Sequence, residues 1–308
     1  MAKIPLFIPT PFPASDGLSD AYVAVGADAL KTDDPILREV RGAAMAGAMP
    51  VTADMFARMP KLEIVAKFGV GYDNVDVEAA HARNIVVTNT PDVLTEEVAD
   101  LTLGLLIATV RRIPQADRFL REGNWPSGRF PLSGSLRGRR VGILGLGRIG
   151  LAIARRVVAM GLNVSYCTRT PRTDVPYTYC ETPLSLAQNC DVMIVVVPGG
   201  ASTDGLVDAK VIAALGPEGM LINVARGSVV DEDALIKALA SGQLGASGLD
   251  VFTNEPQVPD ALKALENVVL LPHIGSGTTT TRKAMGDYVF ANLESWFAGR
   301  GPLTPVGP

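Results

Sequence analysis

The chain has 308 residues, a length that predicts about two domains. Hydrophobic residues make up 47% and charged residues 19% of the sequence, and the net charge is −4, which is a globular composition without the basic stripe that nucleic-acid binding requires. The most apolar stretch, 101–110, is far shorter than the roughly 20 residues of a membrane span. The three cysteines have no metal-binding spacing, so we expect a cytoplasmic protein with reduced thiols, no metal and no membrane contact.

Short apolar runs alternate with stretches of helical periodicity, the pattern of parallel sheets covered by helices. In the first third of the chain the expected strands are 4–8, 21–25, 43–45, 64–67 and 85–87, with a helix around 35–42. A second series of strands is expected at 140–144, 163–167, 192–197, 220–224, 248–251 and 268–271. The predicted fold class is α/β, with two Rossmann-like, doubly wound domains.

Two longer helices indicate how these domains connect. Residues 92–112 carry apolar side chains on almost every side, which indicates a helix buried between domains or subunits. Residues 280–297 form the last expected helix, which follows the final strand and can return to the first domain. We therefore expect one domain (92–277) to be inserted into a discontinuous one (1–91 plus 278–308).

A glycine-rich motif follows the first strand of the second series. The apolar run 141–144 leads directly into Gly145-Leu146-Gly147-Arg148-Ile149-Gly150, and a helix over 149–160 follows. In this context the first glycine permits a tight turn, the second lets the backbone approach a pyrophosphate, and the third lets the helix pack on the strand. The alternative is a glycine turn that serves packing alone. The motif predicts that 92–277 binds a dinucleotide, which leaves 1–91 plus 278–308 for the substrate.

Cofactor choice is read about 20 residues further on, at the end of the next strand. An NAD enzyme has a carboxylate there for the ribose 2′-hydroxyl, whereas this chain has Thr168-Arg169-Thr170 and no acid before Asp174. An arginine and two hydroxyls can bind a 2′-phosphate. NADP(H) is therefore favoured over NAD(H), and an exposed arginine in a polar loop is the alternative.

Three side chains with complementary chemistry follow successive strands. His81 lies in a polar helical stretch and is expected at the surface, whereas His273 follows the last strand of the second series. Arg226 and Glu255 follow the two preceding strands, and the carboxyl ends of such strands form the ligand crevice. Arg226 can bind the carboxylate and carbonyl of a 2-keto acid, His273 can donate the proton, and Glu255 can orient the imidazole and maintain its charge. Salt bridges or helix caps are the alternative for each residue alone.

The chain resembles the D-isomer-specific 2-hydroxyacid dehydrogenases, and within them the NADPH-dependent glyoxylate/hydroxypyruvate reductase and plant hydroxyphenylpyruvate reductase branch. The motifs that carry this resemblance are 67–74, 87–95, 145–150, 221–227, 248–252 with Glu255-Pro256, and 271–277. The resemblance as a whole extends from about residue 43 to the C-terminus. At 168–170 and 199–202 the sequence departs from many members of the family, and the first departure is similar to the NADPH-dependent branch.

The resemblance implies the same catalytic set of Arg226, Glu255 and His273. It further implies that the backbone amides of Val70 and Gly71 bind the substrate carboxylate, and that Asp250 contacts the nicotinamide carboxamide. Further residues implied at the cofactor are Val197, Pro198, Thr203, Val224, Ala225, His273 and Gly275. Family members are usually homodimers joined near the long helix, so a homodimer is expected here.

The resulting hypothesis is a reductase that transfers a hydride from NADPH to a small 2-keto acid of the glyoxylate or hydroxypyruvate type, giving the D-2-hydroxy acid. Aromatic keto acids such as hydroxyphenylpyruvate are the second choice of substrate. Residues 47–50 and Phe68 are candidates for shaping the side-chain pocket. A dinucleotide-sensing binding protein without significant turnover is the alternative from another class.

Overall fold

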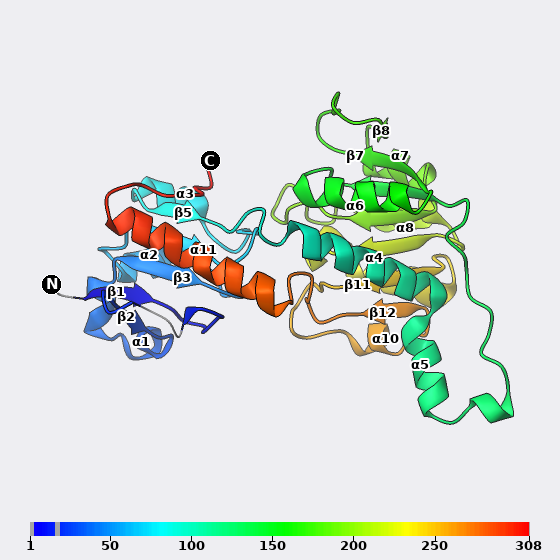
Figure 1. Cartoon of the computed structure of the whole chain (residues 1–308), viewed down its shortest axis with the longest axis horizontal. Helices are drawn as coiled ribbons and strands as arrows, with labels where there is room; N and C mark the ends of the chain where they lie inside the picture. Colours follow the sequence, from blue (N-terminus) through cyan, green and yellow to red (C-terminus); the bar gives the residue numbers. More distant parts are fainter. Residues whose placement is uncertain (1–2, 16–18, 308) are drawn as a thin grey trace. The chain divides into compact units, whose positions relative to one another are not determined.

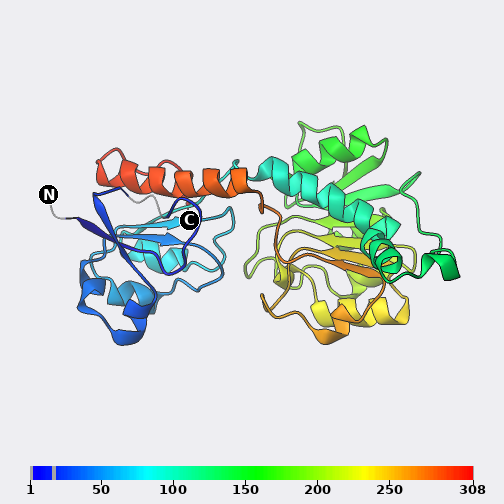
Figure 2. The same ribbon diagram turned by 60° about the horizontal axis from the view of Figure 1, so that its bottom comes forward.

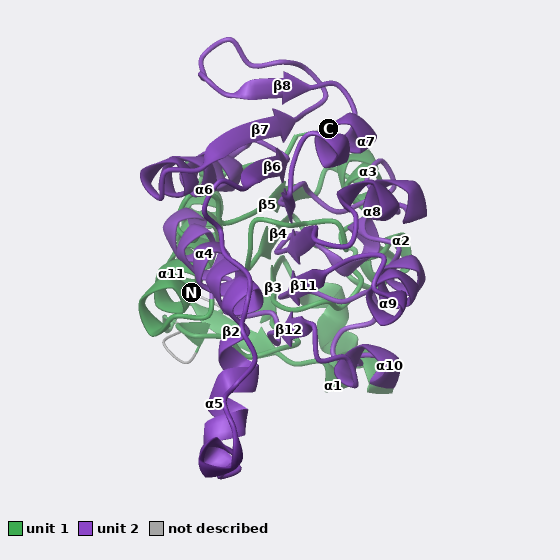
Figure 3. Ribbon diagram, turned by 90° about the vertical axis from the view of Figure 1, so that its right-hand side faces the viewer, with its two compact units in different colours: residues 1–94, 277–308 green, residues 95–276 purple. Residues whose placement is uncertain are grey.

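The chain forms two parallel β-sheets, each covered by helices (Figure 1). The computed structural model describes residues 3–15 and 19–307. The sheets belong to two units: unit 1 comprises Met1–Leu94 and Gly277–Pro308, and unit 2 comprises Thr95–Ser276 (Figure 3). Unit 2 is therefore inserted into unit 1, and α11 (Thr279–Phe297) brings the chain back to the first sheet.

Unit 1 contains a five-stranded sheet in the order β2-β1-β3-β4-β5. Its strands are β1 (Ile4–Phe7), β2 (Tyr22–Val25), β3 (Gly42–Met45), β4 (Ile64–Lys67) and β5 (Val86–Thr88). All neighbouring strands are parallel, with Gly42 opposite Ile64 and Ile64 opposite Val86. The order changes direction between β1 and β3, so the loops that follow β3 and β4 lie at the sheet edge where doubly wound folds bind ligands.

The two faces of this sheet pack against different helices (Figure 2). One face carries Phe7, Met45 and Val65, which are fully buried against the short helices of the unit. Those helices are α1 (Asp28–Thr32), the 3₁₀ helix η2 (Pro35–Glu39), α2 (Ala53–Arg58) and α3 (Val77–Ala82). The opposite face packs against α11, and a Cβ on Gly42 would lie 3.1 Å from the Leu293 side chain of that helix. The glycine therefore permits the close approach of helix and sheet.

Unit 2 contains a seven-stranded parallel sheet in the order β12-β11-β10-β9-β6-β7-β8. Its strands are β6 (Arg140–Leu144), β7 (Asn163–Cys167), β8 (Thr178–Cys180), β9 (Val192–Val195), β10 (Met220–Asn223), β11 (Ala246–Leu249) and β12 (Val268–Leu270). Chain order runs outward from β6 in both directions, which is the Rossmann arrangement with its switch point between β6 and β9. The dinucleotide crevice of such a fold lies at the carboxyl ends of these two strands.

Alternating strand residues in unit 2 supply two separate cores. Val141 and Ile143 face one core, whereas Leu144 faces the other, because successive side chains of a strand point to opposite faces. The first core includes α4 (Thr95–Arg111) and α6 (Arg148–Ala159), which pack against each other. The second includes α7 (Pro183–Gln188), α8 (Ala209–Leu215) and α9 (Glu232–Ser241). The remaining helical segments are α5 (Ile113–Arg121), η3 (Trp125–Ser127), η4 (Gly227–Val229) and α10 (Asp260–Lys263).

Three local predictions need correction. The helix expected around 35–42 ends as a 3₁₀ helix at Glu39, because the Arg41 amide already donates to Pro5 in the sheet and Gly42 begins β3. The sequence alone does not predict the edge strand β8, because this strand has only three residues and some of them are polar. The long helix begins at Thr95, not 92; one side is buried within the chain, Gly104 and Ile107 are exposed, and burial against a second subunit stays a prediction.

Among the described residues, no helix has the length and apolarity that a membrane crossing requires. The three cysteines are free thiols, and all three are buried in unit 2.

Candidate functional site

The three predicted catalytic side chains follow three adjacent strands of unit 2. Arg226 comes after β10, Glu255 after β11 and His273 after β12, and these strands pair directly. Because the strands are parallel, the three residues belong to the same, carboxyl edge of the sheet. The glycine turn after β6 lies at the same edge. The arrangement can therefore combine a bound dinucleotide with a cation, a carboxylate and an imidazole.

His273 and Glu255 form a close pair. Nδ1 of His273 lies 2.6 Å from Oε2 of Glu255, and Oε1 of the same carboxylate accepts the Phe252 amide at 3.0 Å. The backbone at His273 has φ of 53°, a left-handed conformation that is uncommon for a residue other than glycine. The imidazole is about half-exposed, whereas the Glu255 side chain is only 24% exposed. The pair therefore holds a solvent-accessible imidazole in one orientation.

The environment of Glu255 favours its charged form. Burial, the largest single influence, raises the pKa of this carboxyl group, but the hydrogen bond and charge of His273 act in the opposite direction. The Phe252 amide and the charge of Arg226 add to the lowering, and the net result is a pKa below the ordinary value. Glu255 is therefore a carboxylate at neutral pH. In this form it can accept a hydrogen bond from a protonated Nδ1 of His273.

Arg226 is positioned by two neighbours that were not predicted from the sequence. Asn223, which is 1% exposed at the end of β10, donates to the Arg226 carbonyl at 2.9 Å and accepts the Ala225 amide at 3.0 Å. A Cβ on Gly227 would lie 1.9 Å from the carbonyl carbon of Phe252, so only glycine fits there. The sequence shows an asparagine before Arg226 and a glycine after it, but it does not show that Asn223 is buried or what Asn223 and Gly227 contact.

Asp250 fixes the segment that follows His273. Its two carboxylate oxygens accept the backbone amides of Ile274 at 2.7 Å and Gly275 at 2.8 Å. The side chain is 1% exposed, and burial is the main reason that its pKa is raised. The amide of Gly275 is thus engaged inside the protein. A contact of Asp250 or Gly275 with the cofactor stays a prediction.

The glycine turn has the geometry of a phosphate-binding loop. Gly145 has φ of 100°, and a Cβ on Gly150 would lie 2.1 Å from the Gly145 carbonyl oxygen, so both glycines are required for the turn itself. By contrast, a Cβ on Gly147 would meet no atom within 4 Å. No side-chain hydrogen bond caps α6 at Gly147, and the N-terminus of a helix is where backbone amides and the helix dipole bind an anion. This open, uncapped helix N-terminus fits a dinucleotide pyrophosphate.

The loop after β7 carries no carboxylate at its start. Thr168 donates through Oγ1 to the Thr170 carbonyl at 2.7 Å, which makes a compact turn. Arg169 and Thr170 are exposed, and Arg169 has no ion pair within the described part of the chain. The loop can therefore offer a guanidinium to a phosphate group.

The remaining predicted cofactor residues lie on the loops after β9 and β10. Val197 and Val224 are half-buried, Ala225 is buried, and Pro198 is exposed. The Thr203 hydroxyl donates to the Pro198 carbonyl at 2.7 Å, so it shapes its own loop. His81, which lies in α3, is half-buried.

In unit 1, the predicted substrate loop follows β4. Asn89 donates to the Val70 carbonyl at 2.9 Å, and Thr90 exchanges hydrogen bonds with Gly69 through its hydroxyl and its amide. Val70 and Gly71 are half-buried. The motif at 87–95 therefore holds the motif at 67–74 in place.

The neighbouring loop, residues 47–50, is held in a similar way. Lys67, which is only 5% exposed as a residue, donates through its ammonium group to the Gly47 carbonyl at 2.6 Å, and Asn74 donates to the Met49 carbonyl at 2.6 Å. Residues 47–50 thus lie against the substrate-loop motif, which is compatible with their predicted role in the side-chain pocket.

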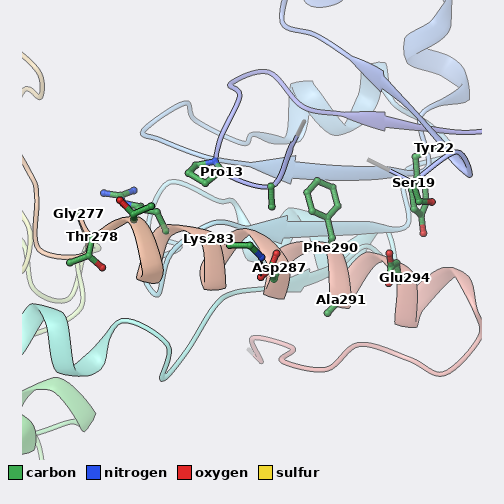
Figure 4. A pocket seen from close by; sticks show the side chains of 13 residues that line it. Pro13, Ser19, Tyr22, Gly277, Thr278, Lys283, Asp287, Phe290, Ala291 and Glu294 are labelled. Carbon is green, nitrogen blue, oxygen red and sulfur yellow. Dashed lines mark hydrogen bonds and ion pairs between the residues drawn. The ribbon is translucent and has the colours of Figure 1, made fainter. Parts of the chain in front are cut away.

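A cavity of about 840 Å³ also lies in unit 1, between α11 and the segment before β2 (Figure 4). Its lining includes Phe290, Asp287 and Arg282. The Arg282 guanidinium lies 5.6 Å from the ring centroid of Phe68, immediately before the Gly69–Gly71 turn. The sequence alone assigns no role to Arg282. Its position soon after the glycine-containing run 274–277 was the one sequence feature that pointed to it.

The fold and this site define an NAD(P)-binding oxidoreductase, and comparison with known proteins identifies its family. Residues 103–275 match the model of the D-isomer specific 2-hydroxyacid dehydrogenase NAD binding domain. The chain belongs to the D-isomer specific 2-hydroxyacid dehydrogenase family.

Two curated relatives and one solved structure illustrate the likeness. Glyoxylate/hydroxypyruvate reductase A HPR2 of Arabidopsis thaliana is 50% identical over 90% of this chain and 88% of its own length. Hydroxyphenylpyruvate reductase of Plectranthus scutellarioides is 49% identical over 88% of this chain and 85% of its own. The structure of an NADPH-dependent glyoxylate/hydroxypyruvate reductase from Sinorhizobium meliloti, in complex with NADP and malonate, has a TM-score of 0.95 and 50% identity, covering 99% of this chain and 97% of that one.

Proposed function

We propose that this protein reduces a small 2-keto acid of the glyoxylate or hydroxypyruvate type to the D-2-hydroxy acid, with NADPH as the preferred cofactor. The observation that carries the proposal is the His273–Glu255 pair, 2.6 Å apart, on the sheet edge that also bears Arg226 and the glycine turn. The names of the relatives from Arabidopsis thaliana and Sinorhizobium meliloti support the same reaction.

Each catalytic residue has one task in this proposal. NADPH supplies the hydride that is added to C2 of the keto acid. Arg226 binds the carboxylate and carbonyl oxygens through its planar fork and stabilises the negative charge that develops on the carbonyl oxygen. His273, protonated and oriented by Glu255, donates the proton from Nε2 to that oxygen. The proton lost by His273 is replaced from solvent, to which the imidazole is exposed.

The two units take different parts in the proposal. Unit 2 binds the dinucleotide, since it contains the Rossmann sheet, the uncapped helix α6 and the open position at Gly147. Unit 1 binds the substrate, with the amides of Val70 and Gly71 donating to its carboxylate. The hydrogen bonds from Asn89 and Thr90 support this role, because they fix the loop without using those two amides.

The preference for NADPH rests on Thr168-Arg169-Thr170. Arg169 is exposed and lacks an ion pair within the described residues, so its guanidinium is available to a 2′-phosphate. In an NAD enzyme the carboxylate that binds the 2′-hydroxyl would repel this phosphate. The solved relative from Sinorhizobium meliloti, which is named NADPH-dependent, supports the assignment.

Initial rates test the reaction. NADPH and NADH oxidation should be followed with glyoxylate, hydroxypyruvate and 4-hydroxyphenylpyruvate, using the wild type and His273→Ala. NADPH-linked turnover that favours the two small acids and is largely lost in the variant is the expected result. A preference for 4-hydroxyphenylpyruvate would favour the second candidate, an aromatic keto-acid reductase, to which the 49% identical relative from Plectranthus scutellarioides points.

The same assay separates the enzyme from a dinucleotide-sensing binding protein. Such a protein would bind NADPH in a calorimetric titration but reduce none of the three keto acids. The His273–Glu255 pair favours the enzyme, because an oriented proton donor is needed for turnover and not for sensing.

The proposal includes assembly as a homodimer in the cytoplasm. Ile107, Ile113, Leu120, Trp125 and Leu132 are large apolar residues that are exposed along one stretch of unit 2. Such a series is typical of a surface that another subunit covers. Free buried thiols are typical of a reducing compartment. Native mass spectrometry at micromolar concentration should give twice the chain mass of 32.4 kDa.

A further inference from the structure

Arg172, which no part of the proposed reaction uses, bridges the two segments at the phosphate end of the dinucleotide site. Its Nη1 donates to the Leu146 carbonyl at 2.8 Å, in the middle of the glycine turn. Its Nε donates to Asp174 at 3.0 Å, and Nη2 contacts the other oxygen of the same carboxylate. One guanidinium thus joins the turn after β6 to the loop after β7.

The position of Arg172 is set by the protein itself. The Tyr166 hydroxyl accepts the Arg172 amide at 2.8 Å and donates to the Arg172 carbonyl at 3.2 Å. Tyr166 belongs to β7 and is 1% exposed, so it is a fixed anchor in the core. Leu146 is likewise buried, at 2% exposure. The bridge is therefore held in place by contacts within the protein.

The charges of this loop explain what the bridge does. Residues 168–174 contain two cations, Arg169 and Arg172, and one carboxylate, Asp174. An unpaired carboxylate here would repel a 2′-phosphate, which carries nearly two negative charges at neutral pH. The bidentate contact with Arg172 neutralises Asp174 and leaves Arg169 as the net charge of the loop.

We propose that Arg172 is a positioning residue for NADPH selectivity: it neutralises Asp174 and fixes the glycine turn through Leu146, so that Arg169 alone faces the 2′-phosphate. The inference rests on the proposed NADPH preference and deepens it. In this arrangement Arg172 acts through its neighbours and does not itself bind the phosphate.

Nucleotide binding tests this role without any need for turnover. The dissociation constants of NADPH and NADH should be measured by fluorescence titration for the wild type, Arg172→Gln, Asp174→Asn and the double variant. We expect Arg172→Gln to weaken NADPH binding by about 10-fold and NADH binding by less than about 3-fold, because one unpaired carboxylate is exposed to the phosphate. The double variant should regain an NADPH/NADH ratio within about 3-fold of the wild type, since the repulsive charge is then gone.

A matched control uses a second arginine–aspartate pair of the same sheet. Arg140, at the start of β6, is paired with Asp191 in a similar bidentate contact, with Nη2 to Oδ1 at 2.7 Å. Arg140→Gln should leave the NADPH/NADH ratio unchanged. Equal loss of selectivity in Arg140→Gln would overturn the proposal, because it would indicate a general effect of destabilising the unit.

The remaining outcomes are also decisive. A double variant as unselective as Arg172→Gln would overturn the proposal in favour of direct phosphate binding by Arg172. An unchanged ratio in Arg172→Gln would refute the role of Arg172 while leaving the proposed cofactor preference intact. A wild-type ratio near one would refute that preference and this inference together. Keto-acid turnover is a separate measurement, so failure of the proposed reaction cannot be mistaken for any of these results.

Discussion

Nδ1 of His273 lies 2.6 Å from Oε2 of Glu255, and the other oxygen of that carboxylate accepts the Phe252 amide. Both oxygens are therefore held, and the imidazole cannot rotate without losing a charge-assisted hydrogen bond. Nε2 remains as the ring nitrogen that can face a substrate. The pair is a structural requirement for the proton transfer that we propose, and it can be tested from either side.

Removing the imidazole should abolish most of the activity and leave the cofactor site intact. We expect His273→Ala to lower kcat with NADPH and glyoxylate by at least about 100-fold, the usual contribution of a general acid. The dissociation constant of NADPH should change by less than about 3-fold, since the glycine turn is untouched. His81→Ala is the matched control and should keep full activity. Retention of more than a tenth of kcat in His273→Ala would contradict the assignment.

Neutralising the carboxylate should change the pH dependence. The pKa of Glu255 is lowered, despite the opposing effect of burial, by its contact with His273, so the wild-type side chain stays charged from neutral pH well into the acid range. Glu255→Gln keeps the hydrogen-bonding oxygen but loses the negative charge of the contact with Nδ1 of His273. We therefore expect kcat/KM to fall by about 10-fold at neutral pH and by less at the acid end, where the wild-type carboxyl group is itself protonated and its contact loses the same charge. Profiles from about pH 4 to 8 that run parallel for both proteins would argue against this role.

The elements of this site differ in how far the sequence predicts them. The glycine motif, Arg226 and His273 were predictable because each directly follows a short apolar run, and a parallel sheet brings the ends of such runs to one edge. Only the order of the runs was needed for this inference. The insertion of unit 2 was predictable for a similar reason, since a helical pattern follows the last strand.

Features that depend on exact backbone positions were not predictable. The left-handed conformation at His273 and the contact of Gly227 with the loop after β11 arise where segments distant in sequence meet. Asn223 looked like an ordinary strand residue, although its amide fixes Arg226. The helix expected at 35–42 ends at Glu39, because the Arg41 amide donates to the Pro5 carbonyl in the sheet. Sequence periodicity does not reveal such a hydrogen bond.

The glycine turn allows a test that separates folding from nucleotide binding. A Cβ on Gly147 would meet no protein atom within 4 Å, so Gly147→Ala should keep the midpoint of thermal unfolding within about 2 °C. The added methyl group would occupy the space expected for the pyrophosphate, so NADPH binding should weaken by about 10-fold or more. Calorimetry measures both quantities. Unchanged NADPH affinity would mean that the pyrophosphate does not contact Gly147.

Gly150→Ala is the contrasting variant in the same turn. Its Cβ would lie 2.1 Å from the Gly145 carbonyl oxygen, a contact that backbone atoms cannot relieve without movement. We expect a loss of about 1–3 kcal/mol in the free energy of unfolding together with weaker NADPH binding. A variant as stable as the wild type would show that α6 can shift away from β6 without cost.

Asn223 should affect the substrate more than the cofactor. Asn223→Ala removes two hydrogen bonds that hold Ala225 and Arg226, so Arg226 loses its fixed position. We expect the KM for the keto acid to rise by about 10-fold, with stability lowered by about 1–3 kcal/mol. Ser247→Ala, which removes a buried hydroxyl bonded to Leu221 in the same sheet, is the control for stability alone. An equal rise of KM in the control would exclude a specific role for Asn223.

The buried thiol of Cys190 should limit stability at alkaline pH. Burial, with a smaller effect of Asp191, raises the pKa of this thiol to about 12, whereas in the unfolded chain the value is about 8.5. A thiol with a raised pKa contributes its full stability below pH 8.5 and loses it as the pH rises toward the folded value, so wild type should lose about 2 kcal/mol from this group between pH 7 and 10. Cys190→Ala should be less stable than wild type at pH 7, because a cavity forms beside Gly142, but the difference should shrink or reverse at pH 10. Urea unfolding under reductant at both pH values measures it, and since Cys167 and Cys180 are present in both proteins, an identical difference at pH 7 and 10 would contradict the burial argument.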